Sequence, residues 1–404
     1  MTKHKIRGFI GVKSNDGHDA PILVVADILK KGGIETILGG YDLTVDKFVR
    51  AIIQEGVHFA GISSYNGGHL PFFKAVRDEL CKRNHPHIHL IGGGGSTITA
   101  PEIEILEQEE GIDKIFKSGE GDLIVPYIRG HYDFSVAPGN PENLDVRNGD
   151  ELAVSQWLNL AEEKARLESL LEGTASPEIS DSASEVRNQI DRYARCLAGL
   201  NKAHTAVYGI TGRGGSGKST LLDELVLRFF NDGRNSRRKL AIIAIDPSSH
   251  TSGGALLADR IAYMYATDKN WVDTGRIFIR SVAARGFGRG IARALPDMIK
   301  ILKAAGYDIF VESYGIGQPD TGIVEFVDKT VFVATPDIGG AAQIAKEEML
   351  SVPGAYVTLN KNELRGARHV ASLLRAKVER LFFTTAIEHR NPGVDELYQS
   401  LTRP

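Results

Sequence analysis

Residues Val207–Thr220 read VYGITGRGGSGKST, an apolar run followed by a glycine-rich loop and then by residues that favour a helix. The loop has the pattern G-x-x-x-x-G-K-S, whose glycines let successive backbone N–H groups point at one anion. Lys218 supplies a compact charge for the outer phosphates, and the Ser219 hydroxyl is placed to ligate Mg²⁺ at the helix N-terminus. A chance glycine loop is the alternative to a triphosphate site. The residues predicted to bind the nucleotide are Gly212, Gly214, Gly215, Ser216, Gly217, Lys218, Ser219 and Thr220.

The composition is typical of an ordinary soluble protein. The 404 residues are 25% charged with a formal net charge of −3, and they leave room for two or three domains. This balance indicates neither nucleic acid nor a membrane as a partner. No apolar run has membrane-spanning length, and the start MTKHKIRGFIGV lacks the apolar core of a secretory signal, so we expect a cytoplasmic protein. Cys81 and Cys196 have no paired spacing, which predicts reduced, structural thiols.

Residues 6–135 alternate short apolar runs with segments of helical periodicity. This alternation predicts a parallel sheet with helices on both faces, in which ligands bind beyond the carboxyl ends of the strands. Polar or glycine-rich loops follow three of the strands: SNDGHD from Ser14, SSYNGG from Ser63 and GGGGS from Gly92. The expected strands are 6–12, 35–39, 59–63, 89–92 and 114–116, and the expected helices are 21–31, 45–55, 70–83 and 99–109.

In the first of these loops, Asp16 precedes His18 by two residues. A carboxylate in that place can accept the proton of one ring nitrogen, which leaves the other nitrogen to bind a metal. Taken alone, the pair fits a surface histidine near a turn better than a metal ligand. The four glycines that start at Gly92 shift this interpretation, because glycine leaves room for a bulky group against the backbone.

Together these loops resemble the cobalamin-binding domain of the base-off, His-on mutases, over the part of the chain before residue 135. The resemblance implies that His18 is the lower axial ligand of cobalt and that Asp16 orients it. The family pattern has a glycine where this chain has Pro21. A flavodoxin-like interaction domain that has lost the cofactor is the alternative. The resemblance further implies a slot for the displaced nucleotide tail, lined by Ser63, Ser64, Gly92, Gly93 and Gly94.

The character of the chain changes after this region. Phe134–Gly149 is rich in Pro, Gly and Asn, which predicts an irregular connection. Glu151–Glu172 and Ser184–Leu200 have helical periodicity and are separated by a break rich in Ser and Asp. We therefore expect a helical linker over 136–202 whose charged residues form a solvated face.

Acidic residues end two buried strands that follow the phosphate loop. The run Leu240–Ile245 leads to Asp246, and the run that starts at Ile309 leads to Glu312. Carboxylates in such places hold Mg²⁺ directly or through water, because this small cation prefers oxygen ligands. Each acid alone would also fit a helix cap or a solvated surface. The predicted magnesium ligands are Ser219, Asp246, Asp259 and Glu312, and the predicted catalytic residues are Lys218 and Gln318, which lies in a switch-like turn and would place the attacking water.

Two later strands, 329–334 and 355–359, precede a candidate base-recognition element with the sequence NKNE. G-proteins use N-K-x-D here, and the aspartate accepts two hydrogen bonds from guanine. Glutamate keeps the charge and both acceptors, but its extra methylene must fold to present them. We therefore expect GTP over ATP, with a weakened preference for guanine. The element adds Asn360, Lys361 and Glu363 to the predicted nucleotide-binding residues.

Nearly all of residues 203–400 resembles the small G-protein metallochaperones that serve cobalamin-dependent acyl-CoA mutases. The resemblance lies in D-P-S from Asp246, S-G-G-A-L-L from Ser252, E-S-x-G-x-G-Q from Glu312 and N-K from Asn360. It implies conformational switches that couple GTP hydrolysis to cofactor delivery. The family has basic residues where this chain has S-H-T from Ser249, so we expect slow hydrolysis without a partner.

Joined on one chain, the two halves resemble the amino-terminal portion of the fused isobutyryl-CoA mutases, without the acyl-CoA barrel. Radical rearrangement needs an acyl-CoA held over the cofactor and shielded from water, so we expect no complete mutase. The expected fold class is α/β. It comprises a flavodoxin-like (Rossmann-type) doubly wound cobalamin domain over 1–135, the linker over 136–202 and a P-loop NTPase domain over 203–404.

The resulting hypothesis is an adenosylcobalamin-binding subunit with a built-in GTPase chaperone. It would load, gate or protect the cofactor for an acyl-CoA-binding mutase subunit on another chain, within a homo- or hetero-oligomer. A nucleotide-regulated cobalamin sensor is one alternative, and acyl-CoA rearrangement with an added barrel subunit distinguishes it. A P-loop ATPase with a degenerate first domain is the other, and a spectral titration with adenosylcobalamin distinguishes that one.

Overall fold

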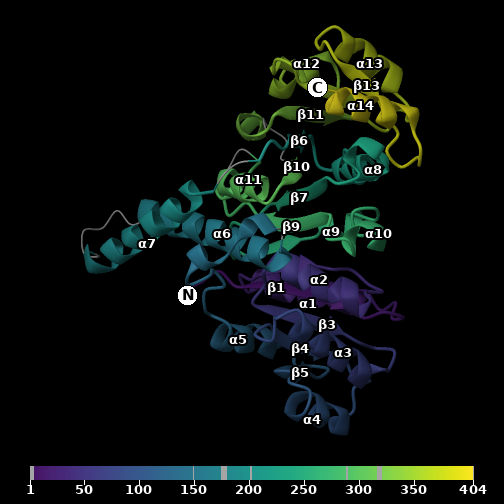
Figure 1. The fold of residues 1–404 in the computed structure, drawn as a ribbon. Helices are drawn as coiled ribbons and strands as arrows, with labels where there is room; N and C mark the ends of the chain where they lie inside the picture. The colour runs from purple at the N-terminus through teal and green to yellow at the C-terminus, as the bar shows by residue number, and fades with distance from the viewer. Residues whose placement is uncertain are drawn as a thin grey trace. The chain divides into compact units, whose positions relative to one another are not determined.

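The computed structural model describes residues 4–148, 150–173, 180–200, 203–287, 290–315 and 321–403 (Figure 1). The chain divides into two compact units. The first comprises Met1–Leu200 with Ser248–Ile261, and the second comprises Asn201–Pro247 with Ala262–Pro404. Most of the expected linker thus belongs to the first unit, which also takes a short segment from the sequence of the expected GTPase domain.

The sheet of the first unit is parallel, with the strand order β5-β4-β3-β1-β2-β8. Strands β1 to β5 have the flavodoxin-like order of a doubly wound sheet, which confirms the fold class expected for this part. Strand β8 is an addition at the β2 edge that the sequence did not indicate. The strands are β1 (Arg7–Val12), β2 (Glu35–Leu38), β3 (Phe59–Ser63), β4 (His89–Gly93), β5 (Lys114–Phe116) and β8 (Ala255–Leu257).

Alternation along β1 explains why helices cover both faces of this sheet. Phe9 points to one face, where its ring meets Phe48 of α2 edge-on at a centroid distance of 5.2 Å. Ile10 points to the other face and packs in a cluster with Ala26 of α1 and Ile128 of α5. The helices are α1 (Ala20–Lys31), α2 (Val45–Glu55), α3 (His69–Lys82), α4 (Ala100–Gln108) and α5 (Gly121–His131), with 3-10 turns η1 (Pro141–Asn143) and η2 (Val146–Asn148).

Two long helices, α6 (Glu151–Gly173) and α7 (Ser180–Ala198), occupy the expected linker region. Helix α6 packs on α2, where Gln54 Nε2 donates to Glu151 Oε1 at 3.0 Å. Glu162 of α6 is buried and accepts a hydrogen bond from Arg7 of β1 at 2.8 Å. The expectation that the charged residues of this region form a solvated face is therefore wrong for Glu162, because Arg7 supplies a buried counter-charge.

The sheet of the second unit is also parallel, with the order β13-β12-β11-β6-β10-β7-β9. Its strands are β6 (Val207–Thr211), β7 (Lys239–Asp246), β9 (Ile277–Ala283), β10 (Tyr307–Glu312), β11 (Lys329–Ala334), β12 (Tyr356–Leu359) and β13 (Leu381–Phe383). Its α-helices are α8 (Lys218–Asn231), α10 (Lys269–Val272), α11 (Leu295–Ala304), α12 (Ala341–Ile344), α13 (Ala367–Arg375) and α14 (Pro392–Thr402), while α9 (Asp259–Ala262) starts in the first unit and ends in the second. Its 3-10 turns are η3 (Gly233–Asn235), η4 (Thr321–Phe326) and η5 (Glu348–Ser351).

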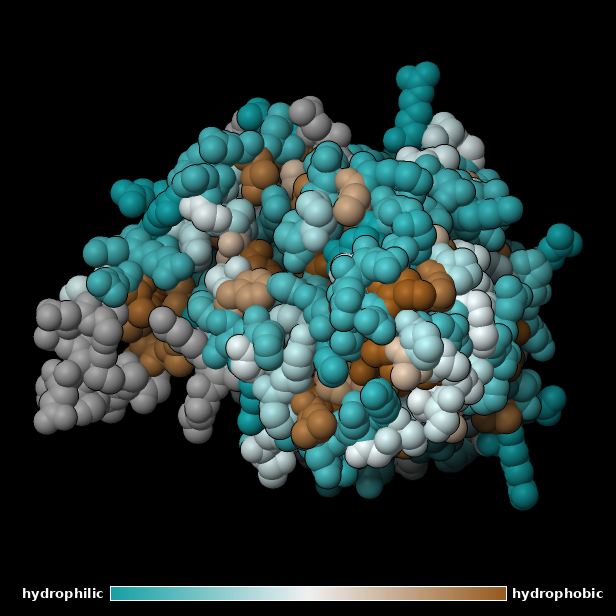
Figure 2. All heavy atoms as spheres, turned by 90° about the horizontal axis from the view of Figure 1, so that it is seen from below, coloured by the Kyte–Doolittle hydropathy of each residue, from teal (hydrophilic) through white to brown (hydrophobic). Residues whose placement is uncertain are grey.

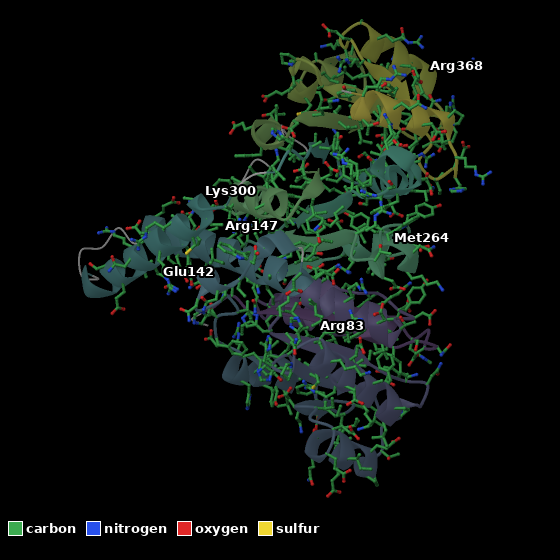
Figure 3. The ribbon with its side chains drawn as sticks, viewed as in Figure 1. Arg83, Glu142, Arg147, Met264, Lys300 and Arg368 are labelled. Carbon is green, nitrogen blue, oxygen red and sulfur yellow. The ribbon has the colours of Figure 1, made fainter. Side chains whose placement is uncertain are left out.

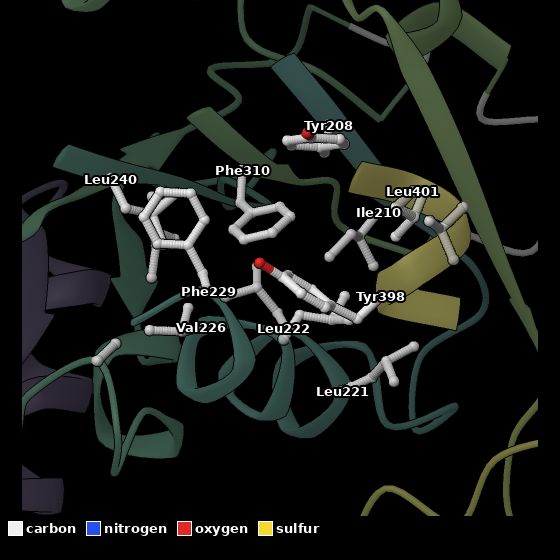
Figure 4. Packing of buried hydrophobic residues seen from close by; sticks show 14 of the residues in the cluster. Tyr208, Ile210, Leu221, Leu222, Val226, Phe229, Leu240, Phe310, Tyr398 and Leu401 are labelled. Atoms are coloured by element: carbon white, nitrogen blue, oxygen red, sulfur yellow. The ribbon is translucent and has the colours of Figure 1, made fainter. Parts of the chain in front are cut away.

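The core of the second unit packs against the helix that follows the phosphate loop (Figure 4). Leu222 and Phe229 of α8 pack in one buried cluster with Ile210 of β6, Phe310 of β10 and Tyr398 of α14. Since β6 and α8 are both fixed by this cluster, the loop between them starts and ends on rigid elements. This arrangement is the strand–loop–helix context that a phosphate site requires.

The surface carries no long apolar segment among the residues described. Hydrophilic side chains cover most of the face shown in Figure 2, and the hydrophobic ones form small patches between them. Among the helices of the described residues, none combines the length and the apolar composition that a membrane span requires.

Candidate functional site

Asp16 and His18 lie in the loop after β1, and the structure brings them together. Asp16 is 2% exposed, and its Oδ1 lies 2.7 Å from Nδ1 of His18. Its Oδ2 accepts the backbone N–H groups of Tyr65 and Asn66, which follow β3. Burial raises the pKa of Asp16, but the hydrogen bonds from Tyr65, His18 and Asn66 outweigh it and the pKa is lowered. Asp16 is therefore an anion that fixes the imidazole with Nδ1–H donating.

The imidazole of His18 is half-exposed, with a side-chain exposure of 53%. Its ring stacks on Tyr65 at a centroid distance of 5.4 Å. Nε2 makes no hydrogen bond with any residue that the structure describes. With Nδ1 bound to Asp16, Nε2 keeps its lone pair and is available as a metal ligand.

A cavity of ≈ 350 Å³ opens at the carboxyl ends of β1, β3 and β4. Its walls are mainly apolar and come from α1, from the strands and from Ile124 of α5. Ser63 and the glycines 92–95 line it at the strand ends. The combination of a long apolar wall with a few polar groups suits a large organic group that has a polar tip.

The glycines beside this cavity also serve the packing of the protein itself. A Cβ on Gly94 would lie 1.9 Å from the carbonyl oxygen of Ser64, and a Cβ on Gly92 would lie 2.4 Å from the ring of Phe73. A Cβ on Gly93 would meet the carbonyl oxygen of Phe116 at 3.1 Å. Ligand space is thus not the only reason for glycine at these positions.

The two adjacent serines have different environments. Ser63 is the last residue of β3 and lines the cavity. Ser64 does not appear in the lining: its Oγ lies 2.7 Å from Nδ1 of His69, and the residue is fully buried. Successive residues of an extended chain point to opposite sides, which accounts for the separation.

The phosphate loop lies between β6 and α8. Gly212, Gly215 and Gly217 have φ values of 147°, 76° and 86°, where a Cβ would be strained. Helix α8 starts at Lys218, which is 8% exposed and whose Nζ lies 3.3 Å from the carbonyl oxygen of Arg213. Gly214 and Thr220 are exposed. Among the described residues, the buried Ser216 Oγ has no hydrogen-bond partner, which fits a loop built to hold an anion.

The structure brings two of the predicted magnesium ligands together. Ser219 Oγ donates to Oε1 of Glu312 at 2.7 Å, and Tyr263 donates to Oε2 at 2.8 Å. Burial raises the pKa of Glu312 above its ordinary value, because it outweighs the hydrogen bond from Ser219 and the charge of Lys218, which lower the pKa. Mg²⁺ in nucleotide sites is held by one or two carboxylates with phosphates and waters, and the Ser219–Glu312 pair fits that requirement.

The remaining predicted catalytic and magnesium residues are Asp246, Asp259 and Gln318. Asp246 ends β7, and Asp259 starts α9 in the segment of the first unit. Gln318 lies outside the described residues. Within the described ranges, no three His, Cys, Asp or Glu side chains form a group that could hold a metal ion. The assignment of Asp246, Asp259 and Gln318 therefore stays a prediction.

The base-recognition element is tied to the phosphate loop by hydrogen bonds. Asn360 Nδ2 donates to the carbonyl oxygen of Ser216 at 2.9 Å, and Lys361 Nζ donates to that of Gly215 at 2.8 Å. Glu363 Oε2 accepts from the Thr385 hydroxyl at 2.9 Å. The longer glutamate side chain is thus held at one oxygen.

Sequence reasoning missed the loop after β13 that completes this element. Asn360 Oδ1 accepts from the Ala386 N–H at 3.0 Å and from the Thr384 hydroxyl at 3.1 Å. The signal was the run Leu381–Phe383 followed directly by T-T-A, small residues at the end of a strand beside the predicted site.

Sequence reasoning also missed the role of the segment Ser248–Ile261. Strand β8 pairs with β2, with Ala255 opposite Glu35 and Leu257 opposite Ile37. Ser252 Oγ donates to the carbonyl oxygen of Lys30 at 2.7 Å, and Arg260 donates to Glu55 at 3.1 Å. The S-G-G-A-L-L motif is therefore an edge of the first unit's sheet.

Comparisons with known proteins match a family to each of the two parts of the chain. The model "B12 binding domain" matches residues 6–124, and the model "Methylmalonyl Co-A mutase-associated GTPase MeaB" matches residues 181–393. A fused isobutyryl-CoA mutase of Cupriavidus metallidurans is 36% identical over 98% of this chain and 35% of its own length. One from Geobacillus kaustophilus is 33% identical over 99% of this chain and 36% of its own length.

The chain spans about a third of the length of these curated relatives. The GTPase ArgK of Escherichia coli is 29% identical over 49% of this chain and 61% of its own length. The GTPase model alone covers more than half of the chain, over the same region as the phosphate loop and the base-recognition element. This protein therefore belongs to the family of methylmalonyl-CoA mutase-associated GTPases of the MeaB type, with a B12-binding domain ahead of its GTPase domain.

Proposed function

We propose that this protein binds adenosylcobalamin through His18 and uses GTP hydrolysis to load, gate or protect the cofactor for an acyl-CoA mutase. One observation carries the proposal: a single chain holds both an imidazole, fixed by Asp16 and stacked on the cavity-lining Tyr65, and a glycine-rich phosphate loop. The identity of its relatives supports the pairing of these two activities.

At the cobalamin site, the residues of the chain would bind and orient. Asp16 holds Nδ1 of His18, so that Nε2 would be the lower ligand of cobalt. The cavity lined by Ser63 and the glycines 92–95 would take the displaced nucleotide tail. When bound, adenosylcobalamin supplies the radical chemistry of carbon-skeleton rearrangement.

At the nucleotide site, catalysis would rest on positioning and charge. Lys218 would neutralise the outer phosphates, and Ser219 with Glu312 would hold Mg²⁺. Asp246 and Asp259 would complete the metal site, and Gln318 would place the attacking water. Asn360, Lys361 and Glu363 would bind the base, with Glu363 held by Thr385.

The partner would be a mutase subunit that supplies the acyl-CoA-binding barrel in trans, in a homo- or hetero-oligomer. The support is that the matched relatives are named as fused isobutyryl-CoA mutases. Such a barrel would provide the shielded acyl-CoA site that radical chemistry needs.

A spectral titration of the full chain with adenosylcobalamin tests the first half of the proposal. The wild type should shift the cofactor to the base-off, His-ligated spectrum, and His18→Ala should remove that shift. His131→Ala changes an exposed histidine of α5 and serves as the matched control. Val25 lines the cavity, so Val25→Trp should fill part of it and weaken cobalamin binding although His18 is intact. A wild-type chain that leaves the spectrum unchanged and retains no cobalamin on gel filtration refutes cobalamin binding.

Two further measurements test the second half. The chain should hydrolyse GTP faster than ATP, and Lys218→Ala should abolish turnover. Addition of a purified acyl-CoA-binding barrel subunit should yield cobalamin-dependent rearrangement that responds to the nucleotide. Binding without any rearrangement would favour a cobalamin sensor, and ATP turnover without cobalamin binding would favour an ATPase with a degenerate first domain.

A further inference from the structure

Both carboxylate oxygens of Glu312 are held by hydroxyl groups. Oε1 accepts from Ser219 at 2.7 Å, and Oε2 accepts from Tyr263 at 2.8 Å. Glu312 is 2% exposed and Tyr263 is 1% exposed. A buried carboxylate fixed at one oxygen cannot rotate freely, so the bond from Tyr263 determines that Oε1 is the oxygen that faces Ser219.

Tyr263 is itself fixed to the helix that carries Ser219. Asp223 lies four residues after Ser219 on α8 and therefore on the same face of that helix. Its carboxylate accepts the backbone N–H groups of Met264, Tyr265 and Ala266 at 2.8, 2.9 and 2.8 Å. Met264, which Figure 3 labels, is 77% exposed, whereas Tyr263 is 1% exposed and anchors the loop in the core.

We propose that Tyr263 is a positioning residue of the nucleotide site, whose hydroxyl orients Glu312 toward the magnesium ion bound at Ser219. The inference rests on the proposed function, because it takes Glu312 and Ser219 as the residues that hold Mg²⁺. It adds Tyr263 to the residues of the proposed magnesium site, which the sequence indicated through acidic residues at strand ends. Tyr263 acts through its hydrogen bond to Glu312.

The expected effect follows from what the carboxylate does without its second partner. Mg²⁺ keeps several waters and needs near-octahedral geometry, so an acceptor held in one orientation binds it better than a mobile one. Without the Tyr263 hydroxyl, Glu312 keeps among the described residues only the hydrogen bond from Ser219, and its carboxylate is free to turn. Loss of a group that orients a metal-site ligand costs about 10-fold or more in metal affinity.

The variant Tyr263→Phe keeps the buried ring and removes the hydroxyl alone. The control is Tyr356→Phe, which removes another buried tyrosine hydroxyl of the same unit, one that donates to the carbonyl oxygen of Ser400 at 3.2 Å. The measurement is the affinity of the full-length protein for fluorescent mant-GDP, with saturating Mg²⁺ and with excess EDTA. GTP turnover against Mg²⁺ concentration provides the kinetic counterpart.

Mg²⁺ should increase the mant-GDP affinity of Tyr263→Phe by a factor about 10-fold smaller than in the wild type. In EDTA, the two proteins should bind mant-GDP with the same affinity. The Mg²⁺ concentration for half-maximal turnover should rise by a similar factor, while KM for GTP at saturating Mg²⁺ stays the same. Tyr356→Phe should match the wild type in both measurements. An equal Mg²⁺ enhancement in Tyr263→Phe and wild type refutes the role of Tyr263 alone. A wild type whose affinity ignores Mg²⁺ refutes the proposed metal site and this role with it.

Discussion

Gly254→Ala is predicted to destabilise the first unit, although Gly254 lies in a motif of the GTPase sequence. A Cβ at this position would lie 2.2 Å from the carbonyl oxygen of Lys30 and 3.0 Å from that of Ile34. Both neighbours are backbone atoms at the edge of α1 and β2, so no side-chain rotation can relieve the clash. The segment must move by roughly 1 Å to restore an ordinary contact.

The cost follows from the contacts that such a shift breaks. The hydrogen bond from Ala255 N–H to Ile34 and the bond from the Ser252 hydroxyl to Lys30 lie on either side of Gly254, at 3.3 and 2.7 Å. Each is worth about 1 kcal/mol, and partial exposure of the fully buried Leu257 adds about 1 kcal/mol. We therefore expect a loss of about 3 kcal/mol in the free energy of unfolding of the first unit.

The two tryptophans allow the units to be observed separately. Trp157 is buried in α6 of the first unit, and Trp271 stacks on Phe230 in the second. In a Trp271→Phe background, fluorescence during urea unfolding reports on the first unit alone. Gly130→Ala in α5 is the control, because its Cβ meets nothing within 4 Å. This control should raise stability by about 0.5–1 kcal/mol. A Gly254→Ala midpoint equal to that of the parent would show that β8 does not stabilise this sheet.

Three further outcomes are expected. Burial lowers the pKa of His58 to about 4, and burial with the neighbouring His87 lowers that of His85 to about 4, against 6.5 for an unperturbed histidine. Between these pKa values the unfolded chain binds more protons than the folded one. The free energy of unfolding of the first unit should therefore have its full value above pH 6.5 and fall by roughly 3 kcal/mol per histidine as the pH drops toward 4. Urea unfolding at several pH values measures this fall. Glu363→Asp should raise the ratio of kcat/KM for GTP over ATP by about 10-fold, because the shorter side chain presents both oxygens without the bond to Thr385; an unchanged ratio contradicts this. Asn360→Ala leaves the carbonyl oxygen of Ser216 and the N–H of Ala386 without the amide that both of them bind. The affinity for mant-GDP should therefore fall about 10-fold or more. An affinity equal to that of the wild type would contradict the role of the Asn360 amide.

Local sequence signals predicted the helices and strands that have clear cap or turn residues at their ends. The range 45–55 matches α2, where the Thr44 side chain accepts from Lys47 N–H and Gly56 ends the helix in the left-handed conformation. Phe59–Ser63 and Lys114–Phe116 match β3 and β5, because each is an apolar run between turn residues. In contrast, β8 has three residues, and its partner β2 lies more than two hundred residues earlier in the chain. No local periodicity can indicate such a pairing.

The same contrast holds inside the candidate sites. Ser219 and Glu312 could be placed together from sequence, because each follows a buried run, and in a parallel sheet the carboxyl ends of neighbouring strands meet at one edge. Tyr263 could not, because it reaches Glu312 from a loop that Asp223 holds through backbone N–H groups, and such bonds leave no residue pattern in the loop. The assignment of Ser64 beside Ser63 treated two neighbours as equivalent, although the alternation of the extended chain directs Ser64 to His69. Motifs therefore identify the groups that lie at strand ends, while the residues that orient those groups depend on contacts that only the folded chain creates.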